Sequence, residues 1–95
     1  MGCYYLVACE DLREFIDPRL VGGGANKFNA MIDGPCANLV AFAMMTRWRK
    51  KLVRYVGDET DGDDYYVIRG ERWTLKDGPR WQDVTKLLLK EMADD

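Results

Sequence analysis

The chain has 95 residues, enough for one domain, and 47 % of them are apolar, enough for a hydrophobic core. A net charge of −2, with 32 % charged residues, excludes a surface made entirely for nucleic acid. The absence of histidine excludes Ser–His and Cys–His nucleophiles, histidine acid–base catalysis and histidine metal ligands. Zinc would need four ligands, and only three cysteines are present. We therefore predict no catalytic residue, metal site or cofactor, and expect a binding protein more than an enzyme.

The cysteines and the apolar runs bear on location. The chain has an odd number of cysteines, Cys3, Cys9 and Cys36, and none of them forms a C-x-x-C pair. This pattern is typical of reduced thiols in the cytoplasm. The N-terminus lacks a basic region followed by a long apolar run, so no signal peptide is expected. The unbroken apolar run at 39–45 is far short of the roughly 18 residues that a membrane span needs. We expect a cytoplasmic protein with no membrane contact.

The first third of the chain reads as strands and loops. Residues 3–9 (CYYLVAC) predict a strand that is apolar on both faces and therefore central in its sheet. Residues 13–16 predict the returning strand of a short hairpin, which Pro18 ends. Three consecutive glycines at 22–24 indicate a loop. Residues 26–32 alternate as a strand would, with a short helical turn as the alternative.

The central element is predicted at residues 35–51, PCANLVAFAMMTRWRKK. Alanine and methionine favour helix, Asp33 or Gly34 can cap its start, and Pro35 suits the first turn. The cations that follow would complement the negative end of the helix dipole. Because the helix is apolar over most of its circumference, we expect it between a sheet and either a second helix or another copy of the chain.

The remaining elements complete an α+β pattern. Residues 51–56 predict a strand, 57–64 a polar turn and 65–69 (YYVIR) a second strand, so 51–69 reads as an antiparallel hairpin. Residues 72–75 would continue it, and 81–92 predict a helix with Trp81, Val84, Leu88 and Met92 in one stripe. We predict a single α+β domain over 1–95. Its small antiparallel-rich sheet of four to five strands packs against the central helix and the C-terminal helix.

Two segments carry a resemblance. Residues 15–24 (FIDPRLVGGG) and 47–59 (RWRKKLVRYVGDE) resemble parts of small uncharacterised bacterial and phage proteins. Those proteins have an F-I-D-P-x-x-x-G-x-G element, a central apolar helix and a strand ending in Val-Gly-Asp. The resemblance implies a bacterial or phage origin and a shared small fold, and it brings no known activity.

The acidic loop at 58–64 contains five carboxylates and is a candidate for Ca²⁺ or Mg²⁺ binding. An EF-hand is excluded, because a loop glycine at Gly62 puts Gly57 at the first ligand position and Ile68 where a glutamate is required. A solvated turn is the favoured interpretation. A metal-dependent enzyme using this loop is the second alternative function.

The basic run at 47–54 is the first alternative. Its cations could bind phosphates while Trp48 stacks on a base, which would make a phosphate or nucleic-acid site. These cations are Arg47, Arg49, Lys50 and Lys51. In the simpler interpretation these cations only end the helix and Trp48 completes the core. Residues 47–56 carry +5 and residues 57–66 carry −5, so the two blocks could also pair with each other.

Cys36 and the aromatic residues raise two further questions. A thiol in the first turn of a helix could ionise more easily, although a small buried apolar residue is the commoner role. The chain has three Trp, five Tyr and three Phe, more than a core of this size hides. Because Trp and Tyr dominate interface hot spots, we predict a non-enzymatic protein-interaction module. It binds a protein partner or itself as a homodimer, through Trp48, Tyr66 and Trp73.

Overall fold

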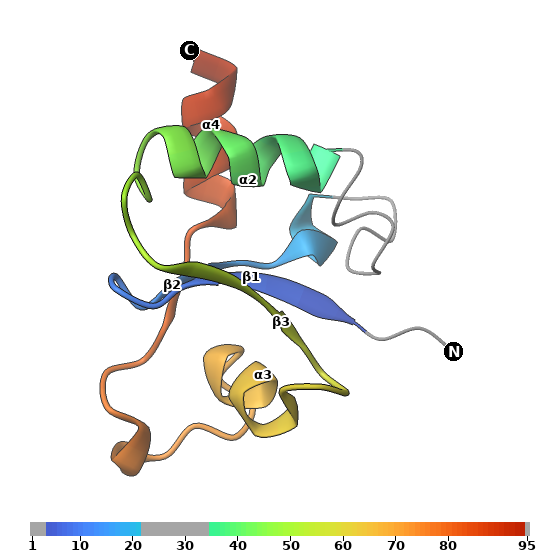
Figure 1. The fold of residues 1–95 in the computed structure, drawn as a ribbon, viewed down its shortest axis with the longest axis vertical. Coiled ribbons are helices and arrows are strands. Elements are labelled where there is room, and N and C mark those ends of the chain that lie inside the picture. Colours follow the sequence, from blue (N-terminus) through green and yellow to red (C-terminus); the bar gives the residue numbers. More distant parts are fainter. Residues whose placement is uncertain (1–3, 22–34, 95) are drawn as a thin grey trace.

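The computed structural model describes residues 4–21 and 35–94 (Figure 1). Four strands form one sheet in the order β3-β1-β2-β4. They are β1 (Tyr5–Cys9), β2 (Glu14–Ile16), β3 (Val53–Gly57) and β4 (Gln82–Asp83). β1 is antiparallel to β2 and β3, and β4 lies parallel to β2. The predicted central first strand and its hairpin partner are confirmed.

Helices cover both faces of the sheet. α2 (Pro35–Met45) and α4 (Thr85–Asp94) lie on one face, and α3 (Gly62–Ile68) lies on the other (Figure 1). The short helical turns η1 (Pro18–Leu20) and η2 (Leu75–Asp77) follow β2 and α3. The α+β class with a largely antiparallel sheet is confirmed. Within the described ranges, no helix has both the length and the apolar character needed to cross a bilayer.

The alternation of side chains along β1 divides the core in two. Val7 and Cys9 pack with α2 and α4, whereas Leu6 and Ala8 pack with α3. All four are at most 1 % exposed, because a strand with helices on both sides has no solvent face. A residue's position in this strand therefore decides which of the two helical layers it touches.

α2 is the predicted central helix, and it ends earlier than predicted. Leu39, Val40 and Ala43 are buried, and α2 packs against α4, so the expected second helix is confirmed. The helix stops at Met45, and turns replace it, with the Trp48 N–H donating to the Ala43 carbonyl at 2.7 Å. The basic residues consequently follow the helix instead of occupying its last turn, and the prediction of cations along a helix to residue 51 is wrong.

The predicted strand at 65–69 is wrong, because these residues form α3 and the hairpin with 51–56 does not exist. Asp63 and Asp64 lie in the first turn of α3, where negative charge is favourable. Tyr65 and Ile68, three residues apart, are buried together against the sheet, as helical spacing requires. The β propensity of YYVIR is thus overridden by helical burial of one face.

The C-terminal elements also differ in detail. Residues 72–75 are not a strand, and β4 pairs with β2 where no strand was predicted. The last helix begins at Thr85, so Trp81 precedes it, while Leu88 and Met92 pack into the core as predicted. The predicted loop at 22–24, the predicted strand at 26–32 and the proposed caps at 33–34 lie outside the described residues.

Candidate interaction face

The α3 side of the sheet carries a group of half-buried aromatic residues with arginines beside them. After α3 the chain turns at Gly70, which has a φ of +85° that suits glycine, and runs through η2 to β4. Thr74 and Asp77 form a reciprocal capping box around η2. The Trp73 indole N–H donates to the Gly78 carbonyl at 3.0 Å. These contacts hold an otherwise irregular segment in one conformation.

Arginine side chains stack on aromatic rings throughout this region. Arg72 lies 4.6 Å from the centre of the Tyr66 ring, and Arg80 lies 4.2 Å from that of Trp73. Such contacts occur about once per 70–80 residues in proteins, so this density is unusual for so short a chain. A Cβ on Gly70 would lie 3.5 Å from Arg80 Nη1, which places Arg80 beside the turn that follows α3.

A third stack, between Arg13 and Trp81, joins this segment to the hairpin turn before β2. The Arg13 guanidinium lies 4.9 Å from the centre of the Trp81 ring. It also donates to the carbonyls of Asp77 at 2.6 Å and Pro79 at 3.0 Å. Arg13 has a φ of +52°, which is costly for a residue with a Cβ, so the surrounding contacts must hold it there. We call Arg13, Tyr66, Arg72, Trp73, Arg80 and Trp81 the arginine–aromatic face.

A fourth stack lies beneath this face and is structural. Arg69 is 5.4 Å from the Tyr65 ring and donates to its hydroxyl at 3.1 Å. Tyr65 is buried, and burial raises the pKa of its phenol to about 12. The Tyr66 ring meets the Tyr65 ring edge-on at 5.2 Å. The core therefore fixes the position of Tyr66 from below.

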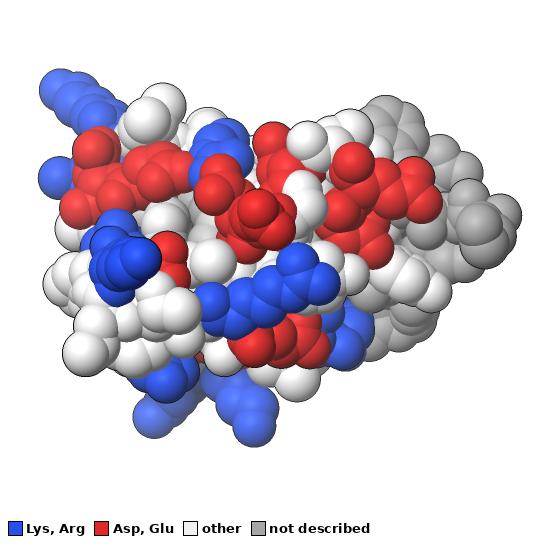
Figure 2. Space-filling view, turned by 90° about the horizontal axis from the view of Figure 1, so that it is seen from below, with Lys and Arg blue, Asp and Glu red and all other residues white. Residues whose placement is uncertain are grey.

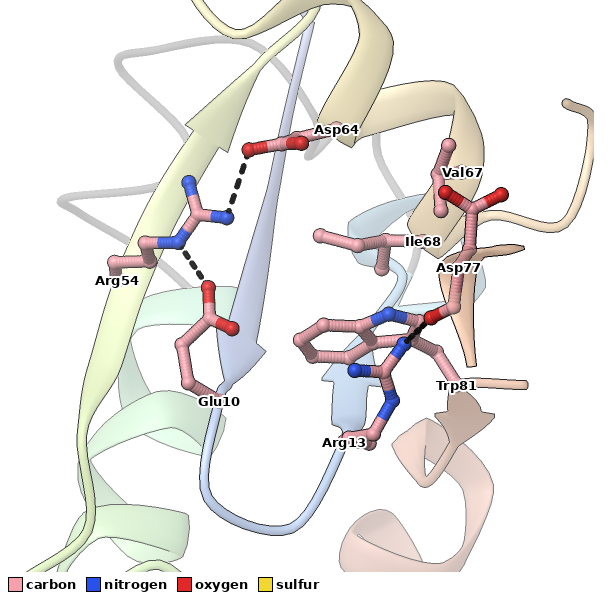
Figure 3. A pocket seen from close by; sticks show the side chains of 8 residues that line it. All are labelled: Glu10, Arg13, Arg54, Asp64, Val67, Ile68, Asp77 and Trp81. Carbon is pink, nitrogen blue, oxygen red and sulfur yellow. Dashed lines mark hydrogen bonds and ion pairs between the residues drawn. The ribbon is translucent and has the colours of Figure 1, made fainter. Parts of the chain in front are cut away.

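A pocket of about 230 Å³ opens beside the arginine–aromatic face (Figure 3). Its charged lining comes from Glu10, Arg13, Arg54, Asp64 and Asp77, and its apolar lining from Val67, Ile68 and Trp81. Arg54 bridges the two carboxylates on one side, donating to Glu10 and, at 3.2 Å, to Asp64. Burial alone would lower the pKa of Arg54, but the hydrogen bonds and charges of Glu10 and Asp64 outweigh it and raise the pKa.

The surroundings of the pocket are acidic. Figure 2 views the molecule from the α3 side and shows acidic side chains in a band across this face, with arginine and lysine among them. Asp63 and Asp64 are exposed, and each pairs with a single arginine, Arg72 at 3.3 Å and Arg54 at 3.2 Å. Each of these two carboxylates is therefore balanced by one arginine within an otherwise acidic band.

The carboxylates of the acidic loop make separate contacts. Asp58 accepts from the Tyr4 N–H at 3.0 Å, and Asp61 accepts from the Gly57 N–H at 3.1 Å. Among residues 4–21 and 35–94, no three His, Cys, Asp or Glu side chains are grouped so that they could hold a metal ion. Asp58 and Asp61 thus close the turn between β3 and α3, whereas Asp63 and Asp64 belong to the first turn of α3 and not to the predicted hairpin turn.

The basic run does not form the predicted stacking site. Trp48 is 1 % exposed, and its indole N–H donates to Glu14 at 2.9 Å. Arg47 also binds Glu14, through two of its nitrogens. Trp48 is therefore a core residue: it cannot stack a base, and its assignment to a contact surface is wrong. Arg49, Lys50 and Lys51 are exposed in the turns before β3.

The two described cysteines are buried. Cys36 is fully buried, and burial raises the pKa of its thiol to about 11, with the charge of Asp17 adding to the effect. Burial likewise raises the pKa of the Cys9 thiol. The predicted alternative of an easily ionised Cys36 is wrong, because the side chain faces the core rather than solvent.

The predicted contact residues are thus separated. Tyr66 and Trp73 lie half-buried on the arginine–aromatic face, whereas Trp48 lies on the other side of the sheet. Arg13 and Trp81, which complete the face, were missed because they are far apart in sequence.

No family model, curated protein or solved structure matches this chain.

Proposed function

We propose that this chain is a non-enzymatic protein-interaction module whose contact surface is the arginine–aromatic face. The observation that carries the proposal is the set of three stacks, Arg72 on Tyr66, Arg80 on Trp73 and Arg13 on Trp81. Trp, Tyr and Arg are the residue types that dominate binding energy in protein interfaces. Stacked pairs are already ordered, so little conformational entropy is lost on binding.

The apolar tip of η2 extends this surface. Leu75 is 86 % exposed, the highest value among the large apolar residues of the described chain. It lies in the segment between the two tryptophans of the face and is held there by the capping box of Thr74 and Asp77. An exposed leucine in the same segment as Trp73 and Trp81 adds apolar area to the proposed surface.

A second copy of the chain is one candidate partner, which keeps the predicted homodimer within the proposal. Arg49, Lys50 and Lys51 are exposed and complement the acidic band that includes Asp63 and Asp64. We place the module in the cytoplasm, where the buried thiols would stay reduced. The resemblance of residues 15–24 and 47–59 supports a bacterial or phage origin.

The exposed cations also support a second candidate function, phosphate or nucleic-acid binding. Arg49, Lys50 and Lys51 have no ion pair with any residue that the structure describes. Against this function, Arg47 is engaged by Glu14 and no aromatic side chain is left in the run to stack a base. Binding by the three remaining cations alone would weaken steeply as salt rises.

Site-specific photo-cross-linking tests the contact surface. A photoreactive amino acid at position 75 should cross-link a partner, or a second copy, when ultraviolet light is applied to the protein in a cell lysate and in purified form. The same residue at position 87, on α4 across the sheet, is the matched control, because Leu87 is also an exposed leucine at 42 %. Equal cross-linking from both positions, or none from 75, would refute the proposed surface.

The solution mass at low and high salt separates the candidate partners. Self-association through the face predicts a dimer that Arg80→Ala weakens and Lys90→Ala, an exposed cation on α4, leaves unchanged. Co-purified nucleic acid, seen as excess absorbance at 260 nm and removed by salt, would instead favour the basic run. A monomer that cross-links a different protein from position 75 identifies the module's partner as another chain.

A further inference from the structure

We infer that the pocket beside the arginine–aromatic face binds an arginine side chain presented by the partner. This inference rests on the proposed function, since the pocket opens on the proposed contact surface. The size of the pocket sets the first limit. Its volume of about 230 Å³ is below the roughly 300–1,000 Å³ of pockets that hold whole small molecules, so it suits one side chain.

The charge of the lining selects a cation. Glu10, Asp64 and Asp77 carry three negative charges, and Arg13 and Arg54 carry two positive ones. Both arginines are already occupied, Arg13 by main-chain carbonyls and Arg54 by the two carboxylates. An anion entering the pocket would therefore meet a net negative lining whose donors are in use.

The carboxylates retain capacity to bind. Glu10 uses Oε1 and Asp64 uses Oδ2 to accept from Arg54, and no described residue donates to their other oxygens. In Figure 3 the Glu10 carboxylate is directed at Arg54, its second oxygen lies on the side of the pocket, and Asp64 lies above Arg54. A carboxylate accepts more than one donor, so a second guanidinium can join without displacing Arg54.

The opposite wall is formed by the side chains of Trp81 and Ile68. Trp81 and Ile68 face the two carboxylates across the pocket (Figure 3). A strongly hydrated metal ion would gain nothing from such a wall, and the two available oxygens are too few for calcium, which takes six to eight. A guanidinium is planar, weakly hydrated and able to stack on an indole while its aliphatic stem covers Ile68. Arg13 already lies 4.9 Å from the centre of the Trp81 ring, so an incoming guanidinium would contact the part of the indole that still lines the pocket.

The test uses N-acetyl-arginine methylamide as the probe and the indole N–H signals of ¹⁵N-labelled protein as the readout. We expect the Trp81 signal to shift with a dissociation constant on the order of 1 mM, as for a small fragment. The Trp48 signal, on the other side of the sheet, should stay in place and report an intact fold. The citrulline analogue, which has the same shape without the charge, and the acetylated glutamate amide should not bind.

Variants assign the binding to the two carboxylates. Asp64→Asn and Glu10→Gln should each weaken binding about fivefold, as expected for loss of one partly exposed charge contact. Asp94→Asn is the matched control at the far end of α4 and should bind as the wild type does. Equal shifts with arginine and citrulline probes, or unchanged affinity of Asp64→Asn, would overturn the inference.

The outcome is separable from that of the proposed function. If the arginine probe leaves Trp81 unshifted while position 75 still cross-links a partner, the pocket assignment falls and the contact surface stands. If the probe binds as expected while position 75 captures nothing, the pocket is real and the surface assignment fails.

Discussion

Replacing Glu14 by alanine should lower the free energy of unfolding by about 3 kcal/mol. The Glu14 side chain is 8 % exposed and binds both Arg47 and the indole of Trp48. Removing it leaves the Trp48 N–H buried without an acceptor, which costs about 1–3 kcal/mol. Breaking a fully buried ion pair costs about 3–5 kcal/mol, but Arg47 is 38 % exposed and can turn to solvent, so we count less than half of that.

The loss is large for a domain of this size. Total stabilities are about 5–15 kcal/mol, and each kcal/mol lowers the melting temperature by about 4–8 °C in domains of 60–100 residues. Urea unfolding followed by tryptophan fluorescence and by circular dichroism measures the change. Glu14→Gln keeps an acceptor for Trp48 and should lose only about half as much. Glu59→Ala, at an exposed position, is the control and should stay within about 0.5 kcal/mol of wild type.

The double variant Glu14→Gln with Arg47→Met measures the coupling between the two partners. Arg47→Met alone leaves a buried carboxylate without its cation and should destabilise the protein more than the double variant does. If Glu14→Ala lies within about 0.5 kcal/mol of wild type, the ion pair does not hold the turn after α2 to β2, and the reasoning fails.

Three further predictions concern pH, glycine and thiol chemistry. Burial would raise the pKa of Glu14, but hydrogen bonds from its two partners outweigh it and lower the pKa below the ordinary 4.5. The stabilisation is therefore complete above that value and lost as pH falls through the lowered pKa, so urea unfolding of wild type and Glu14→Gln should converge in acid. Gly62→Ala, in α3 with open space around it, should stabilise the protein by about 0.5–1 kcal/mol. Gly70→Ala, at φ +85°, should destabilise it by about 1 kcal/mol. If residues 65–69 formed the predicted strand instead of part of α3, thermal melts of the two variants would show no such difference. Cys36, with its pKa raised to about 11, should resist iodoacetamide at pH 8 in native protein and react after unfolding in urea, as peptide mass spectrometry would show; rapid native labelling would contradict its burial.

The elements with a strong local signal could be predicted from sequence. The two-sided apolar run of β1 and the alanine-rich α2 need only their own residues to be recognised. α3 failed because Tyr65 and Tyr66 have β propensity, while the decisive fact, burial of Tyr65 with Ile68 against β1, is a tertiary contact. The two-residue β4 has no local signal, since it exists only through its pairing with β2.

The site was predicted in part for the same reason. Tyr66 and Trp73 could be chosen as surplus aromatics, but Trp48 could not be separated from them without knowing its partner Glu14, 34 residues away. One signal was available: Glu14 lies in β2, which pairs with the two-sided apolar strand β1, and a carboxylate in such a position needs a buried polar partner. The stack of Arg13 on Trp81 had no such signal, because 68 positions separate the two residues.

The parallel pairing of β2 with β4 has a consequence for folding during synthesis. The Gln82 N–H donates to the Arg13 carbonyl, the Val84 N–H to the Phe15 carbonyl, and the Asp17 N–H to the Thr85 hydroxyl. During synthesis on the ribosome, residues 82–88 emerge after every segment that they bind. β2 and α2 therefore lack their contacts with β4 and α4 until these last residues have emerged. Contacts between such distant positions slow folding and leave apolar surface open in the interval. The nascent chain is therefore most exposed to chaperones and proteases just before its C-terminal helix docks.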